Sequence, residues 1–238
     1  DFGSLTPGGS YLEADNQFSS GNPELSPTYA NNLDLMVEYY FDRVGLVSAG
    51  LFYKDIQDPI FQATSVGSYQ GQAGVNLIRP ENGANANLSG IELTLNRDFS
   101  FISNALRDFG LNSNATFMRS AMKIPNRSDT VAIPRQADAL YNLSFYYDNN
   151  TFAARLAANF KGAYIEEHGN NKDLDSYYGK NLSLDFTTSY QLNEQALVYL
   201  ELNNLTNEPL NYYLGNKERP LQVEYYGMRG MLGFSYQF

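Results

Sequence analysis

Hydrophobic and polar residues alternate along most of the chain from residue 31 to residue 238. In the last segment, residues 227–238, one face would consist of Met228, Gly230, Leu232, Phe234, Tyr236 and Phe238. The intervening positions are mostly polar, and this period of two is typical of a β-strand with one apolar and one polar face. Taken alone, the segment would also fit an edge strand of a soluble sandwich, so the rest of the chain must decide.

The same alternation recurs in nine segments, which predicts an all-β, antiparallel fold. They lie near residues 33–41, 47–53, 91–96, 109–117, 139–148, 152–161, 181–190, 198–203 and 228–238. We expect strands of roughly ten residues, longer than the usual strand of a globular sheet. About ten residues is also the length at which a tilted strand crosses a bilayer.

The connections between these segments alternate in length. Short connections lie at residues 42–45, 148–150 and 191–195, whereas long ones lie near 57–87, 120–137, 162–179 and 205–221. The connection after Arg97 is intermediate. Short periplasmic turns and long extracellular loops are typical of transmembrane β-barrels. We therefore predict an extracellular loop over residues 1–27 and barrel strands over residues 28–238.

The amino-acid composition is compatible with the predicted barrel strands and excludes several kinds of chemistry. The chain has no Cys and one His, which removes thiolate metal sites and cysteine nucleophiles. Its formal net charge of -10 argues against nucleic-acid binding, which depends on Lys and Arg. No run of 18 apolar residues predicts a transmembrane helix, and the mean hydropathy of -0.40 suits strands that show lipid only every second side chain.

Charged and aromatic residues occupy different positions in the predicted strands. The charged residues fall mostly on the face opposite the apolar one, where hydration is possible; they are Glu38, Glu92, Arg155, Lys161, Asp185, Glu201 and Arg229. Aromatic residues cluster near strand ends, at 39–41, 146–147 and 236–238. Interfacial girdles of a membrane barrel would place them there, although each cluster alone would also fit a core.

Closure of the sheet imposes a further constraint. Bacterial single-chain barrels have an even number of strands, and an open sheet edge in lipid leaves unpaired backbone groups. Nine strands therefore predict the C-terminal portion of a larger barrel. The final Phe234, Tyr236 and Phe238 resemble the C-terminal signature through which the barrel-assembly machinery recognises outer-membrane barrels.

Four segments together resemble TonB-dependent outer-membrane receptors in their order and spacing: residues 21–41 (GNPELSPTYANNLDLMVEYYF), 50–61 (GLFYKDIQDPIF), 90–96 (GIELTLN) and 203–213 (NNLTNEPLNYY). The resemblance implies a 22-stranded barrel with an N-terminal plug in the outer membrane of a Gram-negative bacterium. It also implies uptake of a scarce nutrient, powered through TonB, with outer-membrane lipid around the barrel. The plug that contacts TonB has no counterpart in these residues.

The resemblance also suggests a ligand. Residues 204–227 look like the Xanthomonas and Caulobacter branch, which is associated with saccharide uptake. A saccharide site combines aromatic stacking with polar hydrogen-bonding groups. The last long loop supplies candidates of both kinds: Tyr212, Tyr213, Asn216, Arg219, Glu224 and Tyr225. The alternative is that these side chains pack the loop itself. A ferric siderophore is the alternative ligand, although it would favour clustered Lys and Arg, and the chain has 16 of these against 26 acidic residues.

Catalysis, cofactors and metals have little support in the sequence. Glu166, Glu167 and His168 form the only His-containing acidic cluster, and we interpret it as a solvated loop. Asp173 and Asp175 make a short acidic pair that is weak as a calcium site. We predict a transporter rather than an enzyme. A porin-like channel and a soluble β-sandwich that binds carbohydrate or acts as an adhesin are the two alternatives.

Overall fold

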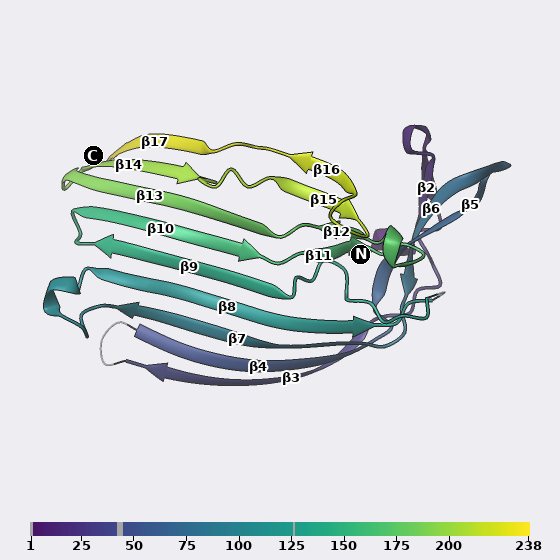
Figure 1. Cartoon of the computed structure of the whole chain (residues 1–238), viewed down its shortest axis with the longest axis horizontal. Helices are drawn as coiled ribbons and strands as arrows, with labels where there is room; N and C mark the ends of the chain where they lie inside the picture. Colours follow the sequence, from purple (N-terminus) through teal and green to yellow (C-terminus); the bar gives the residue numbers. More distant parts are fainter. Residues whose placement is uncertain (1, 42–44, 126) are drawn as a thin grey trace.

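A single nine-stranded antiparallel sheet forms most of the computed structural model, which describes residues 2–41, 45–125 and 127–238 (Figure 1). The order of strands is β17-β14-β13-β10-β9-β8-β7-β4-β3, so neighbours in sequence are neighbours in the sheet. The strands are β3 (Tyr29–Tyr40), β4 (Gly45–Gln57), β7 (Ala86–Asp98), β8 (Phe109–Met122), β9 (Ala139–Asp148), β10 (Phe152–Lys161), β13 (Asn181–Asn193), β14 (Ala196–Asn203) and β17 (Arg229–Tyr236). All nine strands predicted from the alternation are confirmed.

The register aligns the alternation of one strand with that of the next. Leu35 pairs with Leu51, Leu51 with Ile91, and Ile91 with Phe117, which places apolar side chains in one row across four strands. The opposite face carries most of the polar side chains of these strands, and there the Asn142 amide donates to Asn114 Oδ1 at 2.7 Å. A shift of one residue would reverse both faces, so the register follows from the sequence pattern. We call these two sides the apolar face and the polar face.

The apolar face of this sheet is open. Leu33 and Leu232 are 71% and 75% exposed, and Val37, Leu51 and Phe234 are exposed as well. In the described part of the chain no second layer covers them, so the soluble sandwich alternative is wrong. No helix among the described residues is long and apolar enough to cross a membrane. The apolar face has the character of a surface that meets lipid tails.

The two ends of the sheet differ, as the sequence predicts. At one end, which we call the short-turn end, lie the turns after β9 and β13, the connection between β7 and β8, and the C-terminus (Figure 1). That connection contains η3 (Asn104–Leu106), capped by the Ser103 hydroxyl, which accepts from the Ala105 N–H. The predicted turn at 42–45 lies outside the described residues apart from Gly45.

Two further four-stranded sheets stand at the other end, which we call the loop end (Figure 1). One contains β1 (Gly9–Leu12), β2 (Gln17–Ser20), β6 (Gln72–Asn82) and β5 (Ile60–Tyr69); the other contains β11 (Tyr164–Glu167), β12 (Ser176–Tyr178), β15 (Leu210–Leu214) and β16 (Pro220–Glu224). Short 3-10 helices η1 (Phe2–Leu5), η2 (Glu13–Asp15) and η4 (Lys172–Leu174) interrupt these segments. The long loops are therefore largely structured.

The buried core also lies at the loop end rather than between two layers. Its members are Phe61, Ala86, Met122, Ile124 and Val131, with Met122 only 1% exposed. They join the β5–β6 hairpin to the ends of β7 and β8 and to the chain that follows β8. This packing fixes the loops against the rim of the main sheet.

On the polar face, two glycines allow tyrosine rings to lie flat on the sheet. Gly110 pairs with Tyr146, and Gly233 pairs with Tyr199. A Cβ atom at either glycine would collide with the ring of its partner. The aromatic rings therefore cover the neighbouring strand instead of projecting away from the wall.

Candidate functional site

Three tyrosines from three loop strands pack together at the loop end. Tyr164 in β11 pairs with Tyr178 in β12, and Tyr178 pairs with Tyr212 in β15, so all three lie on the same side of this small sheet. The Tyr164 and Tyr178 rings stack with centroids 5.0 Å apart, and Tyr212 meets Tyr178 edge to face at 5.1 Å. We call Tyr164, Tyr178 and Tyr212 the tyrosine shelf.

Lys161 is the last residue of β10, and its position shows on which face of the main sheet the tyrosine shelf lies. Its neighbours Asn159 and Arg155 belong to the polar face, and its Nζ lies 4.1 Å from the centroid of Tyr178 and 5.0 Å from that of Tyr164. The tyrosine shelf therefore extends the polar face beyond the rim. The ammonium group is held over the rings by cation–π attraction, and no carboxylate in the described residues pairs with it.

Arg135 and Glu166 form an ion pair beside the tyrosine shelf, with Arg135 Nε 2.7 Å from Glu166 Oε1. The Arg135 side chain is 69% exposed, whereas that of Glu166 is 19% exposed. Burial, and then the nearby Glu166 carboxylate, raise the pKa of Tyr164 to about 12, so its hydroxyl remains a neutral donor at physiological pH. Stacking rings, one unpaired ammonium and a polar pair are thus close together.

The other side of the same small sheet is packed against the protein. Tyr177 stacks on Tyr213 with ring centroids 5.2 Å apart and planes 5° from parallel. Tyr213 is 7% exposed and Ile165 is 8% exposed. This stack supports the tyrosine shelf from behind and is closed to a ligand.

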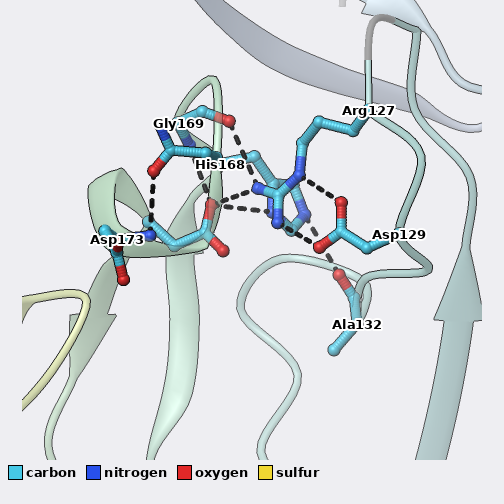
Figure 2. Close-up of polar contacts among 8 residues, drawn as sticks. Arg127, Asp129, Ala132, His168, Gly169 and Asp173 are labelled. Atoms are coloured by element: carbon cyan, nitrogen blue, oxygen red, sulfur yellow. Dashed lines mark hydrogen bonds and ion pairs between the residues drawn. The ribbon is translucent and has the colours of Figure 1, made fainter.

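A buried charge cluster connects two of the loops (Figure 2). Arg127 pairs with Asp129 on its own loop and, through Nη1, with Asp175 Oδ1 at 2.5 Å on the loop between β11 and β12. Arg127 also donates to the Gly169 carbonyl at 3.2 Å, and the Gly169 N–H donates to Asp175 Oδ1 at 3.0 Å. The side chains of Arg127 and Asp175 are 3% and 2% exposed. We call Arg127, Asp129, His168 and Asp175 the loop staple.

His168 completes the loop staple. Its Nε2 lies 3.0 Å from the Ala132 carbonyl, so that nitrogen donates, while Nδ1 lies 3.8 Å from Asp175 Oδ1 and makes no hydrogen bond (Figure 2). His168 is 3% exposed and also forms a β-bridge with Ala63 of β5. The expectation of a solvated loop at His168 is therefore wrong, because partners distant in sequence bury it.

The charges of the loop staple hold its carboxylates ionised. Burial alone would raise the pKa of Asp175, but the His168 ring, the Arg127 guanidinium and the Gly169 N–H together lower it. The Arg127 guanidinium lowers the pKa of Asp129 to about 2. Within residues 2–41, 45–125 and 127–238, His, Asp and Glu side chains do not gather in a group of three that could hold a metal ion.

The loop staple and the tyrosine shelf share one loop. The Arg135 N–H donates to the Ile165 carbonyl at 2.7 Å, which attaches the chain after Arg127 to β11. The Arg219 guanidinium donates to the Asp173 carbonyl at 2.9 Å and ties the β15–β16 turn to the same loop. Arg135 and Tyr164 therefore lie on the same two connections that the loop staple joins.

Comparison of the sequence with protein-family models agrees with the antiparallel barrel sheet seen in the structure. The family model described as "TonB dependent receptor-like, beta-barrel" matches residues 2–205. The chain belongs to this family. TonB-dependent receptors are outer-membrane proteins of Gram-negative bacteria, and this chain is placed in that membrane accordingly. No curated protein matches in sequence.

Solved TonB-dependent receptors and related transporters share the fold at low identity. The siderophore receptor PirA from Acinetobacter baumannii is 18% identical, with a TM-score of 0.63 over 93% of this chain and 33% of its own. The ferric-catecholate import receptor Fiu from E. coli K12 is 15% identical, with a TM-score of 0.61 over 90% and 28%. The copper transporter OprC is 14% identical, with a TM-score of 0.67 over 90% and 32%. This chain thus spans about a third of these proteins.

The structure separates the six ligand candidates that the sequence grouped. Tyr212 lies in the tyrosine shelf, whereas its neighbour Tyr213 faces the opposite way and is buried. Asn216 and Arg219 close the β15–β16 turn through a hydrogen bond from the Arg219 N–H to the Asn216 carbonyl. These four residues therefore occupy three different environments.

The last two candidates lie in and after β16. Glu224 accepts hydrogen bonds from Gln222 and Tyr226, and Tyr225 is 67% exposed. Glu224 also contributes to the raised pKa of Tyr212, after burial and Glu166, whereas the Arg135 guanidinium lowers this pKa. The contact of these residues with a ligand stays a prediction.

Sequence reasoning missed most of the tyrosine shelf and its polar neighbours. Lys161 ends β10, Tyr164 and Tyr178 lie in the connection that follows it, and Arg135 lies in the connection between β8 and β9. Tyr178 and Tyr212 meet only because β12 pairs with β15. One signal was available: Lys161 ends a strand on its polar face, and Tyr164 and Tyr178 flank the loop that follows. A lysine and two tyrosines at the mouth of one loop indicate a site at the rim.

Proposed function

We propose that the full-length protein is a TonB-dependent transporter that binds an anionic, aromatic metal chelate of the siderophore class at the loop end. The observation that carries this proposal is the Lys161 ammonium, which lies over the tyrosine shelf without a carboxylate partner among the described residues. A planar, negatively charged ligand can stack on tyrosine rings and pair with this cation.

Related proteins favour this ligand class over the saccharide expected from the sequence. Solved neighbours include the siderophore receptor PirA and a ferric enterobactin receptor from Pseudomonas aeruginosa in complex with enterobactin. The excess of 26 acidic over 16 basic residues argues against an anionic ligand only as an average over the chain, because a ligand at the tyrosine shelf would meet the positive charge of Lys161 directly. The proposal also includes transport of the ligand, coupling of that transport to TonB, and insertion of the barrel by the barrel-assembly machinery.

The test is calorimetric titration of the full-length protein in detergent with a ferric catecholate siderophore and, separately, with neutral oligosaccharides. We expect the siderophore to bind and Lys161→Gln to weaken binding about tenfold, since a charge-assisted hydrogen bond contributes about 1.5–3 kcal/mol. Lys172→Gln removes the same charge from exposed η4 and serves as the control. Binding of oligosaccharide alone, or equal affinity in both variants, would overturn the proposal.

A further inference from the structure

Arg97 is an unusual residue because it is charged and lies on the apolar face. It pairs with Gly45 and Leu111, two residues beyond Leu95, at the short-turn end. Among the described residues of the nine strands, the apolar face carries other charges only near the loop end, at Asp55 and Arg119. A charge at the middle of a lipid-facing strand costs several kcal/mol, but the cost is small near the interface.

The Arg97 guanidinium is enclosed by two phenylalanine rings. Its Cζ lies 3.8 Å from the centroid of Phe41 and 3.8 Å from that of Phe101. Two aromatic faces thus lie against the guanidinium, and hydrogen bonds to it must come from the edge that carries its N–H groups. In the described part of the chain, no carboxylate forms an ion pair with Arg97 and no oxygen accepts a hydrogen bond from it. Within residues 2–41, 45–125 and 127–238 the edge is therefore left without an acceptor.

The surroundings of Arg97 place this edge at the level of lipid headgroups. Phe101 and Ile102 are 56% and 62% exposed at the tip of the connection after β7. From Phe101 a series of ring contacts continues along the short-turn end through Phe99, Phe145, Phe109, Tyr147 and Phe152, with centroids 4.7 to 6.4 Å apart. This row has the character of an interfacial aromatic girdle, and from it the apolar face continues toward the middle of the sheet.

We infer that Arg97, Phe41 and Phe101 form a binding site for the phosphate group of a membrane glycerophospholipid. The edge of a guanidinium matches two phosphate oxygens, which can accept two parallel hydrogen bonds. Leu111 lies directly opposite Arg97 and Leu95 lies two residues nearer the middle of the sheet, and together they supply an apolar surface for the acyl chains. Charge complementarity and the adjoining apolar surface select a lipid phosphate over free phosphate.

This inference goes beyond the family assignment, which places lipid around the whole apolar face without a specific headgroup contact. It is also independent of the ligand proposed for the tyrosine shelf, because the two sites lie at opposite ends of the sheet (Figure 1). Failure of either proposal would leave the other intact.

The test is native mass spectrometry of the full-length protein, stripped of lipid in detergent and then titrated with phosphatidylglycerol. We expect Arg97→Gln to reduce the bound fraction about tenfold, as loss of a charge-assisted contact would. Arg119→Gln removes a charge from the same face at the loop end and is expected to bind as the native protein does. Diacylglycerol, which has no phosphate, is expected to show no dependence on Arg97.

Two further measurements keep the test decisive if Arg97→Gln assembles poorly. Arg97→Lys keeps the charge but not the planar edge, and Phe101→Leu removes one covering ring; both are expected to bind phosphatidylglycerol more weakly than the native protein. Millimolar inorganic phosphate is expected not to displace the lipid. Equal lipid binding in Arg97→Gln, Arg97→Lys and the native protein, or equal losses in Arg97→Gln and Arg119→Gln, would overturn the inference.

Discussion

Arg127 provides the main positive charge around Asp175, a carboxylate that is almost completely buried. Replacing Arg127 with Met would leave that carboxylate without a cation, and removing one partner of a buried pair costs about 3 kcal/mol. We expect the Arg127→Met protein to lose hydrogen-exchange protection in residues 168–175 while the strands of the main sheet keep theirs.

The exposed pair of Arg79 and Glu81 offers a matched control for this prediction. Their side chains are 55% and 28% exposed, and exposed pairs contribute about 0–1 kcal/mol. Arg79→Met should therefore leave protection almost unchanged. Similar losses in both variants would show that the loss of any arginine, rather than of the buried pair, loosens the loops.

Acid should release the loop staple in a defined pH range. The pKa of Asp175 is lowered and that of Asp129 falls to about 2, so these carboxylates bind protons more weakly in the folded protein than in the unfolded one. Their stabilisation is complete above the ordinary carboxyl pKa of about 4 and is lost as the pH falls through the lowered values. We expect constant exchange protection of residues 168–175 from pH 8 to about pH 5, and a loss of protection below about pH 4.

A single added methyl group should disturb the polar face at Gly233 but not at Gly50. A Cβ atom at Gly233 collides with the Tyr199 ring, whereas at Gly50 its nearest neighbour is Met36 Cε at 3.5 Å. Overpacking of this kind costs about 1–3 kcal/mol. We expect Gly233→Ala to lower the free energy of unfolding in detergent and Tyr199→Ala to relieve part of that loss. Equal effects of Gly233→Ala and Gly50→Ala would contradict this account.

At the scale of elements, the strands could be predicted from the sequence and the loop sheets could not. Alternation is a local signal, and in β13 or β17 it continues over the whole strand. The loop sheets depend instead on pairing between distant short segments, such as β2 with β6 and β12 with β15. His168 was misjudged for the same reason, since Arg127 and Ala132 lie more than thirty residues away.

Neighbouring residues of β17 allow a direct test of the two faces. Leu232 is 75% exposed on the apolar face, and Met231 pairs with Glu201 on the polar face. A lipid-facing arginine near the membrane midplane costs about 2–4 kcal/mol. We therefore expect Leu232→Arg to destabilise the full-length protein by this amount in denaturant titrations with lipid vesicles, and Met231→Arg to be tolerated. The reverse order would mean that the faces are assigned wrongly.

On the scale of the whole molecule, three regions of the main sheet differ in the side chains that they present. One face exposes the apolar side chains, the short-turn end carries the aromatic row with Arg97, and the loop end carries the tyrosine shelf on the continuation of the polar face. The loop staple joins separate loops near that shelf, so a ligand bound at the proposed site would be coupled to the position of these loops. Such coupling would allow a bound ligand to order the loops around it.

The open edges of the main sheet lead to the last prediction. β3 is exposed along all of its residues and has no second neighbour in the described part of the chain, and β17 is likewise paired on one side only. Unpaired backbone groups cost several kcal/mol each in hydrocarbon, and an exposed apolar edge favours aggregation in water. We therefore expect further strands to pair with these two edges in the full-length protein.

We expect these 238 residues, expressed alone and refolded without detergent, to give no compact monomer in size-exclusion chromatography and no cooperative denaturant transition. The full-length protein in detergent should give both, because its remaining strands satisfy the two edges and detergent covers the apolar face. Recovery of a compact, detergent-free monomer from residues 1–238 would contradict the membrane assignment. It would require the apolar face to be buried in water by a packing that the nine-stranded sheet does not provide.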